Sequence, residues 1–383
     1  MSEIPPAVGT LKQLVLVGGG HAHLFVLERL AKARPGGWGV TLVSPSSWQH
    51  YSGMLPGMMA GTYRSEECGI DLRPWIDRTG ARFVECAAIG IDADRRVVCL
   101  PQHVRISYDL LSLDVGGESD LSSLAALGPR LVPVRPLPAF AARWNEIRRQ
   151  AAASPGFRLA IVGGGAAGVE LALAARAGLG PSAEIQLVVG KSGLLRTFPG
   201  GVRRHAEIAL WNSQIEVLCC DAAGSPDGLL LHDGRTCEAD AVLSATGVRA
   251  PVWLGLSKLA LDSQGFVAVD RFQRSVSHPD VFAAGDVSTR IDVAVARSGV
   301  HAVRAGPPLA TNLLAAMAGR PLRAYRPRRT RLYLLSTGTR RAIASFGPWS
   351  GEGAWVWRWK NAIDRRFIAR FALPSAASPA DTE

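Results

Sequence analysis

The sequence predicts an α/β fold, because two glycine-rich turns each lie between an apolar run and a helical pattern. The first stretch reads "LVLVGGGHAHLF" over 14–25, and the second reads "AIVGGGAAGVEL" over 160–171. Apolar runs bounded by glycine are typical of buried parallel strands. We therefore expect two Rossmann-like dinucleotide-binding domains and a small C-terminal segment. Two glycine turns without ligands are the alternative, which their repeated strand–turn–helix context makes the weaker interpretation.

The first unit begins with the run "LKQLVLVGGG" over 11–20, which predicts a strand followed by a helix over 21–33. Further strands are expected over four later stretches: 38–45, 81–92, 95–100 and 108–117.

The proline-punctuated stretch 128–140 marks the expected crossing between the two units. A helix over 141–152 leads into the second strand, turn and helix, and "AEIQLVVG" over 183–190 is the next strand. Later elements are expected as strands over 240–247 and 278–286, a helix over 298–319, and a disordered tail over 374–383.

The composition indicates an ordered globular protein, with 48% hydrophobic and 20% charged residues among 383. No apolar run reaches the ~18 residues of a spanning helix, and no signal peptide is apparent. We therefore expect a cytoplasmic protein. The net charge of +11 comes without a nucleic-acid-binding motif, so no nucleic acid is expected. The 8 histidines and 6 cysteines lack metal-ligand spacing, so no metal is expected.

The glycines of each turn have separate tasks. The first permits the tight bend, the second lets the backbone approach a pyrophosphate, and the third lets helix and strand pack closely. The second turn has all three, at Gly163, Gly165 and Gly168, whereas the first has Gly18 and Gly20 but carries His23 in the third position. Two dinucleotides in one chain suggest a relay from a diffusible nicotinamide to a tightly held flavin.

These motifs, with "LSATG" and "DVFAAGD" following in order, resemble the two-dinucleotide flavoprotein reductases of the pyridine nucleotide-disulfide oxidoreductase type. "HYSGMLPGMMAG", "SGVHAVRAGPPLATNL" and "WVWRWKNAIDRRF" resemble the type II NADH dehydrogenase-like branch, and within it the proteins found beside or fused to selenide, water dikinase. The resemblance implies an FAD domain over 1–115 and 246–325, an inserted NAD(P)H domain over 116–245, and a membrane-proximal segment over 326–373.

The resemblance also implies which residues meet each cofactor. For FAD they are Gly18, Gly20, His21, Ala22, Ser44, Gly53 and Asp286. For NAD(P)H they are Gly163, Gly165, Ala166, Gly168, Glu170, Lys191 and Gly247. An ordinary acid in the first turns of a helix is the alternative for Glu170.

Three departures from the pattern bear on the cofactors. The acid that usually holds a ribose hydroxyl is replaced by Ser44 in the first unit and by Val189 in the second. Because Lys191 lies two residues after Val189, the sequence allows NADPH as well as NADH as the electron donor. His23 either fills a locally wider gap or contacts the cofactor, whereas a cofactor contact is the favoured interpretation for His21.

The function that the resemblance implies is transfer of a hydride from NAD(P)H to FAD and of electrons to a quinone-like acceptor, with no general base named. The stretch after the second strand has no cysteine pair, so disulfide chemistry is not expected. A reaction on a small sulfur or selenium species remains an alternative, since Cys68 could lie near the flavin. A non-catalytic, nucleotide-sensing flavoprotein is another.

The C-terminal stretch "AWVWRWKNAIDRRFIARF" over 354–371 predicts a helix with aromatic and aliphatic residues four apart. The residues of this stripe are Trp355, Trp359, Ile363, Phe367 and Phe371, with Arg358, Lys360, Arg365, Arg366 and Arg370 as the cations beside them. Tryptophan beside cations suits an anionic membrane surface on the inner face of the membrane. Packing on the chain's own core or on a second subunit, as in a homodimer, is the alternative.

Overall fold

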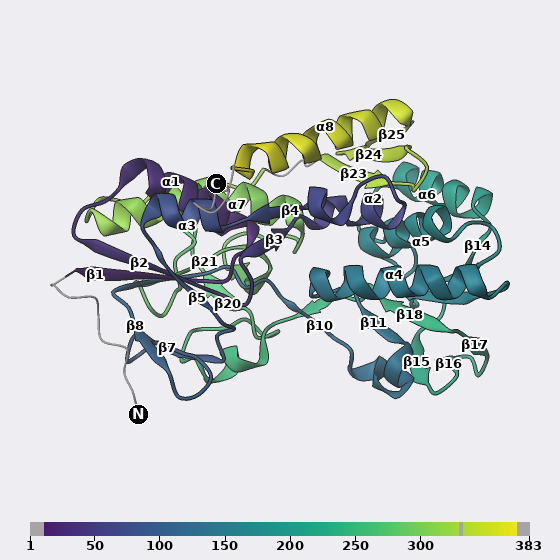
Figure 1. Cartoon of the computed structure of the whole chain (residues 1–383), viewed down its shortest axis with the longest axis horizontal. Coiled ribbons are helices and arrows are strands. Elements are labelled where there is room, and N and C mark those ends of the chain that lie inside the picture. Colours follow the sequence, from purple (N-terminus) through teal and green to yellow (C-terminus); the bar gives the residue numbers. More distant parts are fainter. Residues whose placement is uncertain (1–10, 329–331, 374–383) are drawn as a thin grey trace, which may run out of the picture.

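The computed structural model describes residues 11–328 and 332–373, which form two lobes side by side (Figure 1). Each lobe has a five-stranded parallel sheet at its centre. The predicted α/β fold with two Rossmann-like units is therefore confirmed. The exact domain boundaries stay predictions, and the tail predicted over 374–383 lies outside the described residues.

The first sheet has the strand order β21-β9-β1-β2-β5. Its strands are β1 (Lys12–Val17), β2 (Trp38–Ser44), β5 (Arg82–Glu85), β9 (Leu110–Leu113) and β21 (Val281–Ala283). Helices α1 (His21–Ala33), α3 (Arg73–Thr79) and α7 (Gly299–Met317) accompany it. Because β21 follows the whole second lobe in the sequence, the chain leaves the first sheet and returns to complete it.

The alternation of β1 explains why both faces of this sheet are covered. Leu14 and Leu16 belong to the core shared with α1 and α7, whereas Val15 and Val17 belong to the core on the opposite face. The opposite face carries a small antiparallel sheet of β6 (Gly90–Asp92), β7 (Val97–Cys99) and β8 (Arg105–Ser107).

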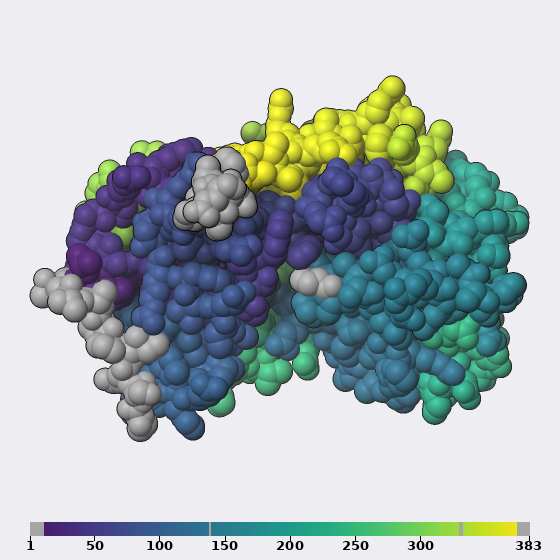
Figure 2. Space-filling model, in the orientation of Figure 1, coloured from purple at the N-terminus to yellow at the C-terminus, as the bar shows by residue number. Residues whose placement is uncertain are grey.

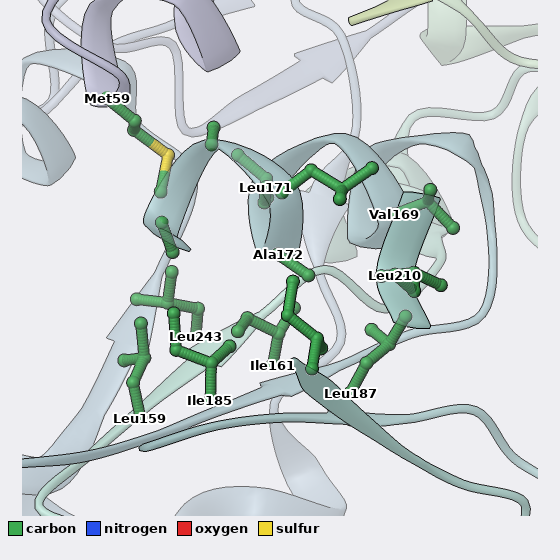
Figure 3. Packing of buried hydrophobic residues seen from close by; sticks show 14 of the residues in the cluster. Met59, Leu159, Ile161, Val169, Leu171, Ala172, Ile185, Leu187, Leu210 and Leu243 are labelled. Carbon is green, nitrogen blue, oxygen red and sulfur yellow. The ribbon is translucent and has the colours of Figure 1, made fainter. Parts of the chain in front are cut away.

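The second sheet has the strand order β11-β18-β12-β13-β14. Its strands are β11 (Leu131–Pro133), β12 (Arg158–Val162), β13 (Glu184–Val188), β14 (Ile215–Leu218) and β18 (Ala241–Ser244). Helices α4 (Leu137–Ala153), α5 (Ala166–Leu179) and α6 (Gly200–Asn212) belong to this lobe. Figure 3 shows Ile161 and Leu187 of the sheet below Ala172 of α5, which buries the apolar stripe of that helix.

Shorter elements complete the two lobes. The strands are β3 (Trp48–His50), β4 (Gly69–Asp71), β10 (Glu118–Ser119), β15 (Ala222–Ser225), β16 (Gly228–Leu231), β17 (Thr236–Glu238), β19 (Val248–Arg249), β20 (Val267–Val269) and β22 (Ser288–Arg290). The helices are α2 (Leu55–Met59) and the 3-10 turns η1 (Ser52–Met54), η2 (Ser65–Cys68), η3 (Ser122–Arg130), η4 (Val252–Leu256) and η5 (Gly285–Val287).

Helix α2 ties the first lobe to the second. Met59 packs into the core beside α5, on the side away from the sheet (Figure 3), and its carbonyl accepts a hydrogen bond of 3.2 Å from the Trp144 indole of α4. A side chain at Gly178 would overlap that same carbonyl, so this glycine is what allows α5 to approach α2.

The C-terminal segment adds the sheet β23 (Leu332–Ser336), β24 (Ala342–Phe346) and β25 (Trp349–Gly353), followed by α8 (Ala354–Phe371). In Figure 2 this segment, in yellow, lies along the upper side of both lobes. Within the described residues, no helix is long and apolar enough to cross a membrane.

The predicted stripe along α8 drifts around the helix, so that its first part is exposed and its last part is buried. Trp355, Trp359 and Ile363 are 46%, 42% and 42% exposed, whereas Phe367 and Phe371 are buried in the first core. Residues four apart advance by roughly 400° on a helix with 3.6 residues per turn, so each step rotates the stripe by about 40° toward the core.

Candidate functional site

The first glycine turn closes around Asp114, which follows β9. The Oδ2 atom of this 3% exposed carboxyl accepts the backbone N–H groups of Ala22 at 2.7 Å and His23 at 3.0 Å. Gly18 has φ +95°, and a side chain at Gly18 or Gly20 would overlap Asp114. Burial raises the pKa of Asp114 to about 7, against the two N–H bonds that favour its charged form.

His23 has a structural role in the turn. Its Nδ1 lies 2.6 Å from the Gly18 carbonyl and its Nε2 lies 2.8 Å from the Ser112 hydroxyl. Burial lowers the pKa of His23 to about 4, so the ring is neutral and can donate from Nδ1 and accept at Nε2. The imidazole thus ties the turn to β9, at the place where the usual glycine lets helix and strand pack closely.

His21, Asp286 and Arg135 form a second polar group beside the turn. The buried Nε2 atom of His21 has no hydrogen-bond partner, and burial lowers the pKa of this imidazole to about 4. The Arg135 guanidinium, from the segment before α4, contacts Asp286 at 3.1 Å. A cation from the other lobe therefore reaches the ends of the first sheet.

Ser44 and Gly53 each have a hydrogen bond within the protein. The Ser44 hydroxyl donates to the carbonyl of Ser46 at 2.8 Å, and a side chain at Gly19 would contact it. The Gly53 carbonyl accepts a hydrogen bond of 2.6 Å from the Lys360 ammonium of α8.

The second glycine turn is open where the first is closed. A side chain at Gly165 would meet nothing within 4 Å, and Gly165 lies at the N-terminus of α5, which begins at Ala166. A side chain at Gly168 would overlap the Gly163 carbonyl, which explains the need for glycine in the third position. The free backbone at Gly165 and the N-terminus of a 14-residue helix suit an incoming diphosphate.

The region after β13 contains an acid that comes from the neighbouring strand. Val189 is buried, but Asp221, which follows β14, accepts the Lys191 backbone N–H at 3.1 Å, and its Oδ1 lies 2.7 Å from where a Gly190 Cβ would be. The Lys191 ammonium is 4.0 Å from the Asp221 carboxylate, and both side chains are largely exposed. At the end of β18, Gly247 is exposed, with open space around it.

Glu170 lies where α5, β23 and α8 meet. Its carboxylate accepts the Ser336 backbone N–H at 2.7 Å, and burial raises its pKa to about 7, although the Lys360 charge opposes this. On α8, the Lys360 ammonium contacts Asp364 at 2.7 Å. Asp364 also shares a hydrogen bond with the Tyr51 hydroxyl, and burial raises the pKa of Asp364.

The same contacts separate Lys360 from the other cations predicted beside the stripe, which are exposed. Lys360 and Asp364 are 9% and 3% exposed, because they lie on the buried face of α8 together with Val356 and Phe367. Glu170, Lys360, Asp364 and Tyr51 thus form one polar group between the two lobes, called here the interlobe cluster.

Cys68 is not an accessible thiol. It packs with Met54 and Tyr63, its Sγ donates to the Arg64 carbonyl at 3.4 Å, and burial raises its pKa to about 12. All six cysteines are free. Cys219 is the exposed one among them. No group of His, Cys, Asp or Glu among the described residues could hold a metal ion.

Sequence reasoning missed four residues that the fold brings to these sites: Asp114, Arg135, Asp221 and Asp364. The stretch "LDVGG" did carry a signal for Asp114, since an acid directly before glycines at the end of a buried strand lies at the edge where ligands bind in parallel sheets. Arg135 and Asp221 come from neighbouring segments, and no local pattern singles them out.

The residues of the first turn fit an FAD diphosphate on the chemistry of their groups. The unpartnered Nε2 of His21 and the Arg135 guanidinium suit an anionic ligand at the start of α1, beside the Asp114 carboxyl. Two such turns in one chain define a flavoprotein that also binds a nicotinamide dinucleotide.

The pyridine nucleotide-disulphide oxidoreductase family matches residues 12–306, and the chain belongs to this family. Its cofactors are accordingly FAD and, as electron donor, NAD(P)H. The predicted family is confirmed, whereas the link to selenide, water dikinase stays a prediction.

The names of the curated relatives mention different electron acceptors. The chain is 27% identical over 292 residues to the probable ferredoxin reductase CtmF of Castellaniella defragrans, covering 73% of this chain and 68% of the relative. It is 25% identical over 322 residues to the alternative NAD(P)H-ubiquinone oxidoreductase C1 of Arabidopsis thaliana, covering 73% and 62%.

Among solved structures, the sulfide:quinone oxidoreductase of Aquifex aeolicus aligns with a TM-score of 0.78, covering 94% of this chain and 91% of that one. Because the two sequences are only 17% identical, this structural likeness shows a shared fold and no more.

Proposed function

We propose that this protein oxidises NAD(P)H and passes the electrons, by way of its FAD, to a quinone-like acceptor held in a membrane. Oxidation of NAD(P)H with FAD follows from the family. The quinone as electron acceptor is the part that we propose. The observation that carries it is the apolar outer face of α8, which lies on the opposite side of that helix from the interlobe cluster.

The chain's own residues would bind and orient the two dinucleotides. The N-terminus of α5 at Gly165 would hold the NAD(P)H diphosphate, and the N-terminus of α1 with Arg135 would hold that of FAD. FAD supplies the capacity to accept two electrons at once and to release them singly or in pairs. Glu170, within the first turns of α5, lies between the NAD(P)H turn and α8.

The proton balance gives the interlobe cluster a task. NAD(P)H supplies two electrons and one proton, whereas a quinone needs two electrons and two protons to become a quinol, so one further proton is taken from solvent and can be relayed by the protein. Glu170 can hold it, because burial raises the pKa of its carboxyl to about 7. Lys360 and Asp364 adjoin it, and the charge of Lys360 opposes protonation of Glu170 whereas that of Asp364 favours it.

The outer face of α8 is suited to a lipid surface. Trp355, Trp359 and Ile363 are exposed there, and Phe346 and Trp349 of the adjoining sheet extend the apolar area. Exposed arginines flank it on the same helix, at Arg358 and Arg366. Tryptophan at headgroup level with cations on anionic lipid is the arrangement of a helix that lies in the membrane interface.

The test compares a quinone in vesicles with a water-soluble acceptor. We expect Trp355→Ala/Trp359→Ala to oxidise NAD(P)H normally with a soluble short-chain quinone, but to lose most of its rate with a long-chain quinone in anionic vesicles. Trp211→Ala is the matched control, since Trp211 is 82% exposed on α6. Equal vesicle rates for the double variant and wild type would contradict the membrane acceptor.

Other acceptors are outcomes of the same assay. Faster turnover with a ferredoxin-type protein than with any quinone would move the function toward the ferredoxin reductases. The sulfur alternative gains no support, because the Cys68 thiol is buried with a raised pKa. Absence of turnover with every acceptor would favour the sensing alternative.

A further inference from the structure

The first glycine turn contains a carboxyl group at the place where an FAD diphosphate has to approach. The Asp114 carboxyl accepts the N–H groups of Ala22 and His23, which are the second and third residues of α1. Helix N-termini offer these groups to an anion, and here a side chain of the protein already binds them.

The carboxyl group has little room to move aside. A side chain at Gly20 would overlap it, and one at Gly285 would lie 2.7 Å from its Oδ1. Gly18 lies against the Asp114 backbone, since a side chain there would overlap the Asp114 carbonyl. A bound diphosphate would therefore have to share the turn with the Asp114 carboxyl.

The charged and titratable groups facing Asp114 come from every element around it. The charge of Asp286, in η5, disfavours a second negative charge on Asp114. Arg135 pairs with the Asp286 carboxylate at 3.1 Å. His21 and His23 of α1 have pKa values lowered to about 4 by burial, so both are neutral near pH 7. His301 of α7 lies in the same region, lining the cavity beside Gly285 and Asp286.

We propose that Asp114 takes up a proton when FAD binds, so that the chain holds the flavin together with one proton. The proton comes from solvent and bonds to Oδ1, because Oδ2 already accepts two N–H groups. The neutral carboxyl then donates a hydrogen bond to a diphosphate oxygen instead of repelling it.

The pH dependence follows from linkage. Burial raises the pKa of Asp114 to about 7 before any ligand is bound, and a diphosphate dianion raises it further. Below this pH the group is already protonated, and the dissociation constant of FAD is flat. Above it each binding event needs a proton, so the dissociation constant rises roughly 25-fold between pH 6.5 and 8.5.

The experiment follows release of FAD from the diluted holoprotein by flavin fluorescence over this pH range. In weak buffer at pH 8, a pH indicator should report close to one proton released for each FAD lost. A dissociation constant that is flat from pH 6.5 to 8.5, or FAD loss without proton release, would overturn the proposal, and neither measurement needs a variant.

Asp114→Asn should bind FAD with a flat pH profile and more tightly than wild type at pH 8.5. Asp114→Ser serves the same purpose if the amide variant does not fold. The control is Asp109→Asn, at the opposite end of β9, where Asp109 also accepts a backbone N–H, from Gln13 at 2.7 Å, but is exposed. It should keep the wild-type slope, and a wild-type slope in Asp114→Asn would refute the assignment.

Discussion

The two glycine turns look alike in the sequence but differ in what occupies the start of the following helix. At the first turn, the Asp114 carboxyl and the His23 imidazole bind the turn to β9. At the second, Gly165 faces open space, and Gly168 lets α5 pack directly on the Gly163 carbonyl.

The difference suits the two ligands expected there. An open helix N-terminus can take up and release a dinucleotide with little rearrangement, as a substrate requires. A turn tied to the sheet by buried hydrogen bonds is preorganised for one resident cofactor, and its own carboxyl group makes binding sensitive to protonation. In the function proposed above, the same motif would serve a cofactor in one lobe and a substrate in the other.

The largest expected effect, loss of a bound dinucleotide, comes from replacing the second glycine of each turn by leucine. Gly20→Leu should release FAD, because its side chain would overlap the Asp114 carboxyl and fill the diphosphate's place. Gly165→Leu should keep FAD but block flavin reduction by either nicotinamide. FAD content from absorbance and stopped-flow reduction distinguish the two. Full FAD in Gly20→Leu would break the comparison.

The third position should show the next largest effect, on stability. Gly168→Ala places a methyl group onto the Gly163 carbonyl, and His23→Ala leaves the Gly18 carbonyl and Ser112 without a partner. We expect each to lower the free energy of unfolding by about 3 kcal/mol. Urea unfolding of the apoproteins measures this, with Gly165→Ala as a nearly neutral control. A neutral His23→Ala would show that its hydrogen bonds are not required.

The helices after the turns also differ, since Glu170 of α5 corresponds to the buried Phe25 of α1. A raised pKa means that the folded protein holds the Glu170 proton up to about pH 7 and loses it above. Turnover with a quinone should therefore fall as pH rises through 7. Glu170→Gln should remove this dependence and lower the rate roughly 100-fold.

Ferricyanide provides the control for this prediction, because it accepts electrons without protons. The Glu170→Gln variant should reduce ferricyanide at the wild-type rate. A parallel loss with both acceptors would instead place Glu170 in nicotinamide binding.

The smallest effect concerns the choice of nicotinamide. Asp221→Asn should shift the preference toward NADPH, and Lys191→Glu should shift it toward NADH, because a 2′-phosphate would meet both side chains. Their exposure limits each shift to about 1 kcal/mol, roughly fivefold in the ratio of kcat/KM values. An unchanged ratio in both variants would remove this pair from the ribose site.

Local patterns were sufficient to predict the elements of both turns. The helix expected over 21–33 is α1, and the strands around the glycines lie where the apolar runs placed them. The division of α8 was beyond such reasoning. Its stripe has helical spacing throughout, and only the position of the first core shows that Phe367 and Phe371 face inward while Trp355 does not.

The sequence by itself determined the two dinucleotide turns, because a strand, a glycine turn and a helix are specified by residues next to one another. The tertiary structure alone decided that Asp114 enters the first turn, that Arg135 reaches Asp286, and that α8 carries Lys360 to Gly53. The physical reason is that these contacts join residues 92, 151 and 307 positions apart. Burial then changes the charge of such groups, and burial is a property of the packed chain rather than of any segment.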